Sequence, residues 1–384
     1  MPRLAPTTAS AHARGRRSFF LLLMVLCMPT PTQAAWGPWV PAKDARLRWE
    51  GRVRLQDDGS AVYDWAGVRL HARFKGGSVA VYAKLGQNYL DAFVDGERVA
   101  VLGRRPKVED HAWADVGVTA TTRGEAPSYV LEGLGRGEHS LVLAKRTGPN
   151  YGPVTLLGLR LGEDGALLGA EPARARRLEF IGDSLTNGYG NEGTSLKCAE
   201  LAPYENNSQS WGRLCGEALK AEVQTVAFSG YGLMRNYGAT ETHSKDPVPF
   251  YYPRTVLAEP GLWDRSLFVP DLSVVFLGTN DHSTPPMPEA AEFIGAYHAF
   301  LTQVRQGRSP GLPILVAYPD DGSSFAQQVE TLVSEEQAQG HKVEGLALPP
   351  AGQGQLGCDW HPLVVVHQRW AELAEARISK ILNW

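Results

Sequence analysis

Two parts of the chain differ in how their apolar residues are spaced. Between Trp36 and Leu168, short segments alternate apolar and polar residues and are rich in Val, Tyr, Leu and Phe. This period of two is typical of half-buried β-strands. The segments are RVRLQ, AVYDWAGVRLHARF, SVAVYAKL, YLDAFVDGERVAVL, SYVLEGL, HSLVLAKR and PVTLLGLRL, with turn sequences such as KGG and VDGE between them. The pattern predicts an antiparallel β-sandwich or jelly roll.

The second pattern begins around residues 171–177. Apolar runs now alternate with long amphipathic stretches such as SSFAQQVETLVSEEQAQG. The apolar runs are at residues 177–181, 223–228, 272–277, 313–318 and 342–348. Such runs are typical of parallel strands that are covered on both faces, and their alternation with helices predicts a doubly wound α/β sheet. We therefore expect two domains, a β-sandwich over residues 35–170 and an α/β domain over residues 171–384.

The first 34 residues predict a secretory signal peptide. The basic stretch ARGRR precedes the apolar run FFLLLMVLCM, and small residues follow as far as Ala34. The apolar run is too short to span a bilayer. The sequence RRSFF also resembles a twin-arginine signal, so the export route is either Sec or twin-arginine. We expect a secreted or periplasmic protein that keeps no membrane anchor after cleavage.

The charge balance argues against a nucleic-acid-binding protein. The 384 residues carry 38 basic and 41 acidic side chains. Removal of residues 1–34 leaves 34 basic side chains against 41 acidic ones, a formal charge of −7. A mildly acidic protein does not neutralise phosphates well, so neutral or weakly charged partners fit better. We expect a monomer.

Three cysteines remain after the predicted cleavage. Cys215 lies in the apolar helical pattern SWGRLCGEALKAE, which predicts a buried core residue. By elimination, an oxidising compartment would pair Cys198 with Cys358. Zinc is the alternative, but the mature chain has neither the Cys-x-x-Cys nor the His-x-x-x-His spacing of zinc sites. We expect no metal and no cofactor.

Polar, glycine-containing runs follow three of the predicted parallel strands. They are GDSLTNGYGN, SGYGLMRNYG and GTNDHS, at residues 182–191, 229–238 and 278–283. Open α/β sheets place their sites beyond the carboxyl ends of the strands. We therefore expect Ser184, Gly230 and Asn280 at one edge of the sheet. Taken singly, each has a structural explanation, as a helix cap, a tight turn and an Asx-turn respectively.

A fourth polar run, GCDWHP at residues 357–362, precedes the last helix and contains His361. Alone it could be a capping turn. In combination, Ser184 and His361 supply a nucleophile and a base, while Gly230 and Asn280 supply hydrogen-bond donors for a developing oxyanion. These are the parts that acyl transfer requires.

The four runs together resemble a known family. GDS with Ser184, then Gly230, GTND with Asn280, and His361 match in order the four blocks of the SGNH (GDSL-type) hydrolases. The longer strings FIGDSLTNGYG, FSGYGLMRNY, LGTNDHS and GCDWHP, behind a β-domain, resemble carbohydrate esterase family 2 over nearly the whole mature chain. This resemblance implies that Ser184 is the nucleophile and His361 the general base. It implies an oxyanion hole made by the backbone N–H groups of Ser184 and Gly230 and the side chain of Asn280.

The acidic residue departs from the wider SGNH pattern. The usual acid stands three residues before the histidine, where this chain has Cys358, whereas Asp359 stands two before it, as in carbohydrate esterase family 2. Asp359 therefore either completes a Ser-His-Asp triad or leaves a Ser-His dyad in which a backbone carbonyl orients His361. Trp360 and Tyr231 are candidate platforms for a sugar ring, with loop packing as the alternative for each.

The resemblance implies an exported serine esterase that removes O-acetyl groups from polysaccharides such as xylan or glucomannan, with a preference for the C6 hydroxyl of hexose units. One alternative is an acetyl esterase that acts on peptidoglycan or exopolysaccharide. Another is a carbohydrate-binding protein without catalysis. The presence of all four blocks favours an enzyme, because an inactive relic should have lost at least one.

Overall fold

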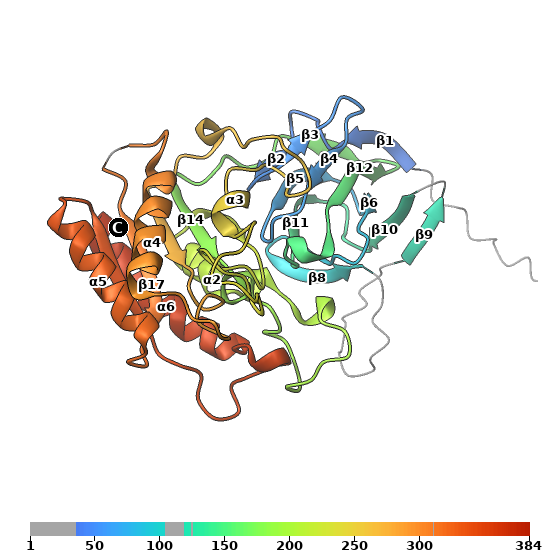
Figure 1. Ribbon diagram of the computed structural model, residues 1–384. Helices are drawn as coiled ribbons and strands as arrows, with labels where there is room; N and C mark the ends of the chain where they lie inside the picture. The colour runs from blue at the N-terminus through green and yellow to red at the C-terminus, as the bar shows by residue number, and fades with distance from the viewer. Residues whose placement is uncertain (1–35, 104–118, 124–125, 310) are drawn as a thin grey trace, which may run out of the picture. The chain divides into compact units, whose positions relative to one another are not determined.

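The predicted signal peptide lies outside the part of the chain that the computed structural model describes, which is residues 36–103, 119–123, 126–309 and 311–384. Residues 35–384 form one compact unit. Antiparallel strands make up the first part of this unit, and a parallel sheet with helices makes up the second (Figure 1).

The antiparallel part contains thirteen described strands. They are β1 (Trp36–Pro41), β2 (Arg48–Glu50), β3 (Arg54–Leu55), β4 (Ala61–Tyr63), β5 (Arg69–Lys75), β6 (Ser78–Lys84), β7 (Leu90–Val94), β8 (Glu97–Leu102), β9 (Thr119–Arg123), β10 (Ala126–Glu132), β11 (Glu138–Lys145), β12 (Val154–Gly162) and β13 (Ala166–Leu168). One sheet has the order β3-β4-β12-β6-β10-β9 with β1 beside β12, and the other has the order β13-β5-β11-β7-β8 with β2 beside β5. In β5, Leu70, Ala72 and Phe74 are buried and alternate with more exposed residues, which is the period of two that the sequence predicts.

The second part is built on a five-stranded parallel sheet. Its strands are β14 (Arg176–Gly182), β15 (Ala221–Ala227), β16 (Leu272–Phe276), β17 (Ile314–Pro319) and β18 (Val343–Leu348), in the order β15-β14-β16-β17-β18. All seven residues of β15 are buried, because both faces of the strand are covered. An antiparallel part followed by a parallel α/β part confirms the predicted fold class.

Four longer helices cover this sheet. They are α2 (Trp211–Ala218), α4 (Ala290–Arg305), α5 (Ser324–Ala338) and α6 (Val364–Leu382), and α1 (Ser184–Asn187) and α3 (Val248–Tyr251) are single turns. Helix α2 packs on α6, and α4 packs on α5. Among the helices of the described residues, none combines the length and the hydropathy that crossing a bilayer requires.

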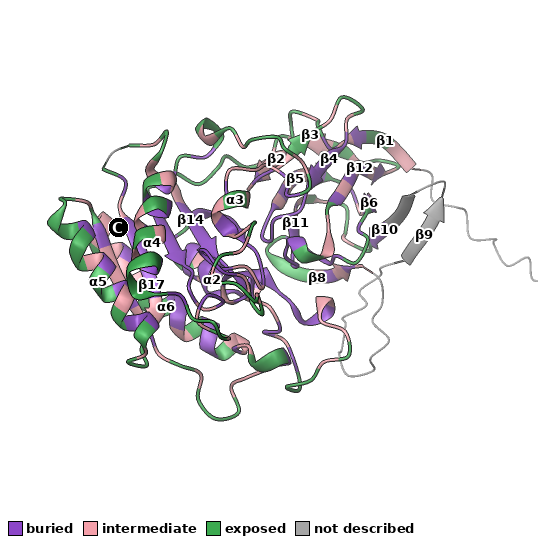
Figure 2. Cartoon of the chain, viewed as in Figure 1, coloured by how far each residue is buried: buried purple, intermediate pink, exposed green. Residues whose placement is uncertain are grey.

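Buried charged residues join the antiparallel part to the α/β part. Glu50 on β2 accepts hydrogen bonds from Arg213 on α2 at 2.6 Å and from the backbone N–H of Val223 at 2.8 Å. Burial opposes the ionisation of Glu50, but the charge of Arg213 holds its pKa well below the usual value. Figure 2 shows buried residues, in purple, within both parts. These contacts connect residues of the antiparallel part to residues of the α/β part.

Candidate active site

Ser184 follows the carboxyl end of β14, which pairs with strands on both of its edges, and is the first residue of α1. Asp183 caps this short helix, because its Oδ1 accepts a hydrogen bond from the N–H of Leu185 at 3.0 Å. Ser184 is only 8% exposed and lines the pocket. The strand-to-helix junction thus fixes the position of the hydroxyl.

Two further loops reach the same edge of the sheet, after β15 and after β16. Gly230 has a φ of +85°, a left-handed conformation that favours glycine. The loop that follows it is anchored by Asp281, whose carboxylate accepts from the backbone N–H groups of Leu233, Met234 and Arg235, each at 2.8 Å. Asp281 therefore holds the Gly230 loop against the Asn280 loop.

The side-chain amide of Asn280 forms two hydrogen bonds within the protein. Its Nδ2 donates to Asp183 Oδ2 and to the backbone carbonyl of Tyr231, both at 3.0 Å. Burial raises the pKa of Asp183 to about 7, and the charge of the neighbouring Asp281 adds to the increase. The side-chain amide is thereby held beside the nucleophile turn.

His361 makes the contact with the nucleophile. Its Nε2 lies 2.8 Å from Ser184 Oγ, and its Nδ1 lies 2.9 Å from the backbone carbonyl oxygen of Asp359. A carbonyl can only accept, so the Nδ1 atom carries the proton and Nε2 has a free lone pair toward the serine hydroxyl. Burial lowers the pKa of His361, which favours this neutral form.

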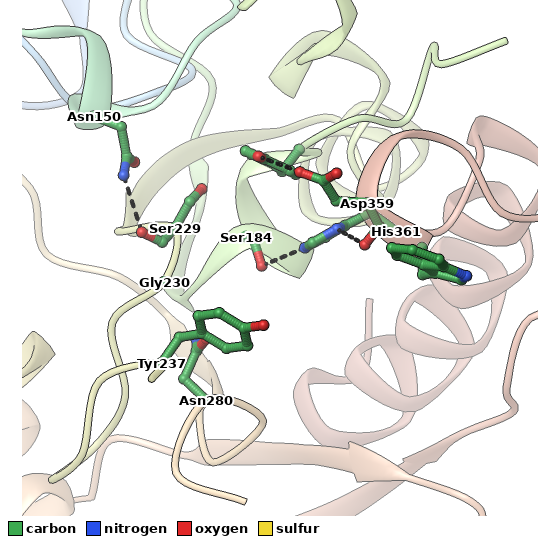
Figure 3. Close-up of a pocket in the computed structure, with 10 residues that line it drawn as sticks. Asn150, Ser184, Ser229, Gly230, Tyr237, Asn280, Asp359 and His361 are labelled. Atoms are coloured by element: carbon green, nitrogen blue, oxygen red, sulfur yellow. Dashed lines mark hydrogen bonds between the residues drawn. The ribbon is translucent and has the colours of Figure 1, made fainter. Parts of the chain in front are cut away.

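The carboxylate of Asp359 points elsewhere. Its Oδ2 accepts a hydrogen bond from the hydroxyl of Tyr189 at 3.0 Å. Of the two alternatives that the sequence leaves open, the backbone carbonyl of Asp359 is the group that contacts the imidazole (Figure 3). The reason is conformational: Asp359 and Trp360 both have positive φ, +50° and +57°, which turns the carbonyl toward His361.

A disulfide between Cys198 and Cys358 holds this turn, with the two Cα atoms 5.4 Å apart. The N–H of Asp359 also donates to the backbone carbonyl of Leu196 at 2.9 Å. Left-handed conformations cost about 1–3 kcal/mol at residues other than glycine and persist only when the surroundings impose them. The loop that carries Leu196 and Cys198 supplies that constraint. Cys215 is buried and is a free thiol.

Six of the predicted site residues meet around one open cavity of ≈380 Å³. It is lined by Asn150, Ser184, Tyr189, Ser229, Gly230, Tyr237, Asn280, Asp359, Trp360 and His361 (Figure 3). Tyr231 is not one of these residues. Its ring stacks on Phe228, with the two ring centroids 3.6 Å apart, which agrees with the packing alternative.

Four lining residues were not predicted from the sequence: Asn150, Tyr189, Ser229 and Tyr237. Tyr189, Ser229 and Tyr237 lie within the polar runs that follow β14 and β15, but the sequence of a run does not indicate which of its side chains face the cavity. Asn150 is the least predictable, because it comes from the antiparallel part of the chain.

A parallel α/β sheet with a serine–histidine pair at its carboxyl edge defines an ester hydrolase of the GDSL type. Residues 180–372 match the GDSL-like Lipase/Acylhydrolase family, and residues 49–170 match the family described as Carbohydrate esterase 2 N-terminal. The chain belongs to carbohydrate esterase family 2.

Relatives support this membership over both parts of the chain. The chain is 32% identical over 348 residues to cellulase/esterase CelE of Acetivibrio thermocellus, which covers 88% of this chain but only 40% of CelE. It is 30% identical over 336 residues to an acetylxylan esterase / glucomannan deacetylase of Cellvibrio japonicus, covering 83% of this chain and 87% of that protein. It also resembles the structure of a family two carbohydrate esterase from Clostridium thermocellum in complex with cellohexaose, with a TM-score of 0.78, 30% identity, and coverage of 88% and 99%.

Proposed function

We propose that this protein is an exported serine esterase that removes O-acetyl groups from polysaccharides such as xylan or glucomannan. The observation that carries the proposal is the 2.8 Å contact between Ser184 Oγ and His361 Nε2, at the wall of an open cavity. The substrate class is supported by the Cellvibrio relative, which is an acetylxylan esterase / glucomannan deacetylase. Residues 1–34 would direct export, and the mature chain would consist of domains 35–170 and 171–384.

The chemistry follows from the protonation states of the pair. His361 Nε2 accepts the proton of Ser184 Oγ as the oxygen attacks the acetyl carbonyl, and a tetrahedral intermediate forms. The imidazolium then gives this proton to the sugar oxygen as the ester C–O bond breaks. A water molecule, deprotonated by His361, hydrolyses the acetyl-enzyme and releases acetate.

Three donors stabilise the oxyanion in this proposal: the N–H groups of Ser184 and Gly230, and Nδ2 of Asn280. Each such donor is typically worth ~10²–10³ in kcat. Because Asn280 Nδ2 already contacts Asp183 and Tyr231, the oxyanion must share or replace one of those two hydrogen bonds.

The base works as part of a Ser-His dyad. The backbone carbonyl of Asp359 fixes the Nδ1–H tautomer of His361, which is the task that an acid performs in a triad. The Asp359 carboxylate, bonded to Tyr189, supports the turn from its other side. Asp359 thus acts mainly through its main chain.

Two exposed aromatic residues favour a carbohydrate substrate. Trp360 is 60% exposed and Tyr237 is 65% exposed, and both line the cavity. Large exposed rings beside a reaction centre suit stacking on the apolar face of a sugar. An open rim of this kind also suits an acetyl group on a primary C6 hydroxyl, which projects away from a polysaccharide chain.

The test is acetate release from acetylated xylan, acetylated glucomannan and O-acetylated peptidoglycan. We expect release from the two plant polysaccharides, and a loss of ~10⁴-fold or more in Ser184→Ala. Ser334→Ala, which removes an exposed hydroxyl of α5 that bonds only within the helix, is the matched control and should be fully active. Release of acetate from peptidoglycan alone would make peptidoglycan the substrate in place of plant polysaccharide. No release from any of the three by the folded protein would contradict the proposed esterase activity.

A further inference from the structure

Asn150 belongs to the antiparallel part of the chain but lines the cavity that contains Ser184 and His361. It lies between β11 and β12, in the short 3-10 helix η1 (Pro149–Tyr151). Its Nδ2 donates a hydrogen bond to the backbone carbonyl of Ser229 at 3.0 Å (Figure 3). The antiparallel part of the chain therefore supplies a side chain to the reaction centre.

The acceptor of this hydrogen bond, the carbonyl of Ser229, is directly linked to a proposed oxyanion donor. The carbonyl of Ser229 and the N–H of Gly230 belong to the same planar peptide group, so whatever orients one orients the other. A donor on the carbonyl also polarises the amide and makes its N–H a stronger donor. Asn150 thus acts on the proposed oxyanion donor from the opposite end of its peptide bond.

The peptide group lies in a turn that is open on one side. Gly230 has a left-handed φ of +85°, and a Cβ at this position would have nothing within 4 Å, so no neighbouring atom packs on that side of the residue. The turn itself is closed by the N–H of Tyr231, which donates to the carbonyl of Phe228 at 3.1 Å. Two further contacts are to flanking groups: Asn187 Nδ2 donates to Ser229 Oγ at 2.9 Å, and the N–H of Tyr237 donates to the carbonyl of Gly230 at 2.8 Å. Among the described residues, Asn150 is the one whose side chain bonds directly to an atom of the 229–230 peptide group.

The segment that carries Asn150 is firmly held. Asn88 Nδ2 donates to the carbonyls of Tyr151 and Gly152, each at 3.1 Å, and Asn88 Oδ1 accepts from Thr147 Oγ1 at 2.7 Å. A Cβ on Gly148 would lie 2.6 Å from Asn187 Nδ2, so only glycine allows the loop to come this close to α1. A side chain on so fixed a loop can define the position of another group.

We propose that Asn150 is a positioning residue of the oxyanion hole, contributed by the antiparallel domain. It orients and polarises the 229–230 peptide group, so that the Gly230 N–H points at the developing charge. This inference rests on the proposed function. It gives the antiparallel domain a part in catalysis that is separate from any binding of polysaccharide.

The test compares Asn150→Ala and Asn150→Asp with the wild type on two substrates, 4-nitrophenyl acetate, which has no sugar, and acetylated xylan. We expect kcat to fall about tenfold in Asn150→Ala on both substrates while KM stays the same, because the Gly230 N–H is then less well oriented and a weaker donor to the oxyanion of the transition state. Asp has the same shape but cannot donate when ionised. The loss of kcat in Asn150→Asp should therefore be larger than in Asn150→Ala, and the ratio of the wild-type kcat to the Asn150→Asp kcat should decrease as the pH is lowered.

The matched control is Gln303→Ala. Gln303 also donates a side-chain amide hydrogen to a backbone carbonyl, that of Pro249 at 3.1 Å, but it does not line the cavity. Its kcat should equal the wild-type value. Thermal unfolding of each variant shows that it is folded.

Two results would overturn the inference. One is an unchanged kcat in both Asn150 variants. The other is a loss confined to acetylated xylan and to KM, which would make Asn150 a contact to the sugar. A failure of the proposed function is distinguishable, because it would show in the wild type: no acetate from acetylated xylan if the natural substrate is another one, and no product from either substrate if the protein is not an esterase.

Discussion

Ser184 lies at the junction of a regular strand and a helix, whereas His361 lies in an irregular turn ahead of α6. On the serine side, β14 pairs with strands on both of its edges and the nucleophile turn is buried. On the histidine side, two successive residues have left-handed backbones, and Trp360 beside His361 is 60% exposed. The two residues that form one hydrogen bond are thus positioned by different kinds of structure.

The histidine side depends on a loop that lies far from it in the sequence. On the serine side, sheet hydrogen bonds hold β14 and the side chain of Asp183 caps α1, so these contacts are close in the sequence or belong to the sheet. The turn of Asp359 and Trp360 is instead held by the Cys198–Cys358 disulfide, the bond to Leu196 and the Tyr189 hydroxyl, all from one loop. Breaking these contacts should displace His361 more than it displaces Ser184.

The largest of these effects should come from the disulfide. In Cys198→Ser/Cys358→Ser we expect kcat to fall ~10²-fold, because the turn that orients His361 loses its covalent anchor and small displacements of a catalytic group have effects of this size. The free energy of unfolding should fall by ~2–5 kcal/mol. Steady-state kinetics and thermal unfolding measure the two effects.

Reduction and reoxidation of the wild type provide the control for the double variant. Reduction should reproduce the loss of kcat, and reoxidation should restore it. In Cys215→Ala the sensitivity to reductant should be the same as in the wild type, because that thiol is not part of the bridge. A double variant with wild-type kcat would show that the other contacts alone maintain the turn.

A smaller effect is expected for Asp359→Asn. Asparagine adopts the left-handed conformation about as readily as aspartate and retains the backbone carbonyl, so we expect kcat to fall by no more than about tenfold. Loss of a triad acid typically lowers kcat ~10⁴-fold. The measurement is kcat on 4-nitrophenyl acetate, and a loss near the larger figure in a folded variant would mean that the carboxylate is the functional partner of His361.

Tyr189→Phe sharpens this experiment. It removes the other end of the hydrogen bond to Asp359 Oδ2. If both substitutions act only through that bond, the double variant should be no less active than the more impaired single variant.

The smallest effect concerns pH. Only neutral His361 can accept the serine proton, so kcat/KM should fall as the pH drops through the pKa of this residue. Because burial lowers that pKa from its ordinary value of 6.5, the midpoint of the acid limb should lie below 6.5. A profile of kcat/KM against pH measures it.

Asp183 is the neighbouring group whose titration must be separated from that of His361, since its pKa is raised to about 7. In Asp183→Asn, an acid limb with the same midpoint would assign the limb to His361. A midpoint above 6.5 in the wild type would contradict the expectation and would mean that the site stabilises the imidazolium.

The residues that could be predicted are those whose position follows from local pattern. The apolar runs predicted the parallel strands, and the rule that sites lie beyond their carboxyl ends placed Ser184, Gly230 and Asn280 at one edge. The structure brings these three and His361 around one cavity. Tyr231 and Tyr237 show the limit: both follow β15, but Tyr231 packs on Phe228 while Tyr237 lines the cavity. The direction of a ring in a loop depends on neighbours that no periodicity reveals.

Hydrophobic periodicity and residue chemistry are local properties, so they were enough to predict the succession of an antiparallel and a parallel part, the four polar runs and, by elimination, the pairing of Cys198 with Cys358. The folded structure was needed to show which oxygen of Asp359 faces His361 and that Asn150 reaches the cavity from the antiparallel part. These contacts depend on backbone angles and on the packing of segments far apart in the chain. Because the energies of these contacts depend on partners far away in the sequence, the contacts cannot be predicted from the spacing of residues along the chain.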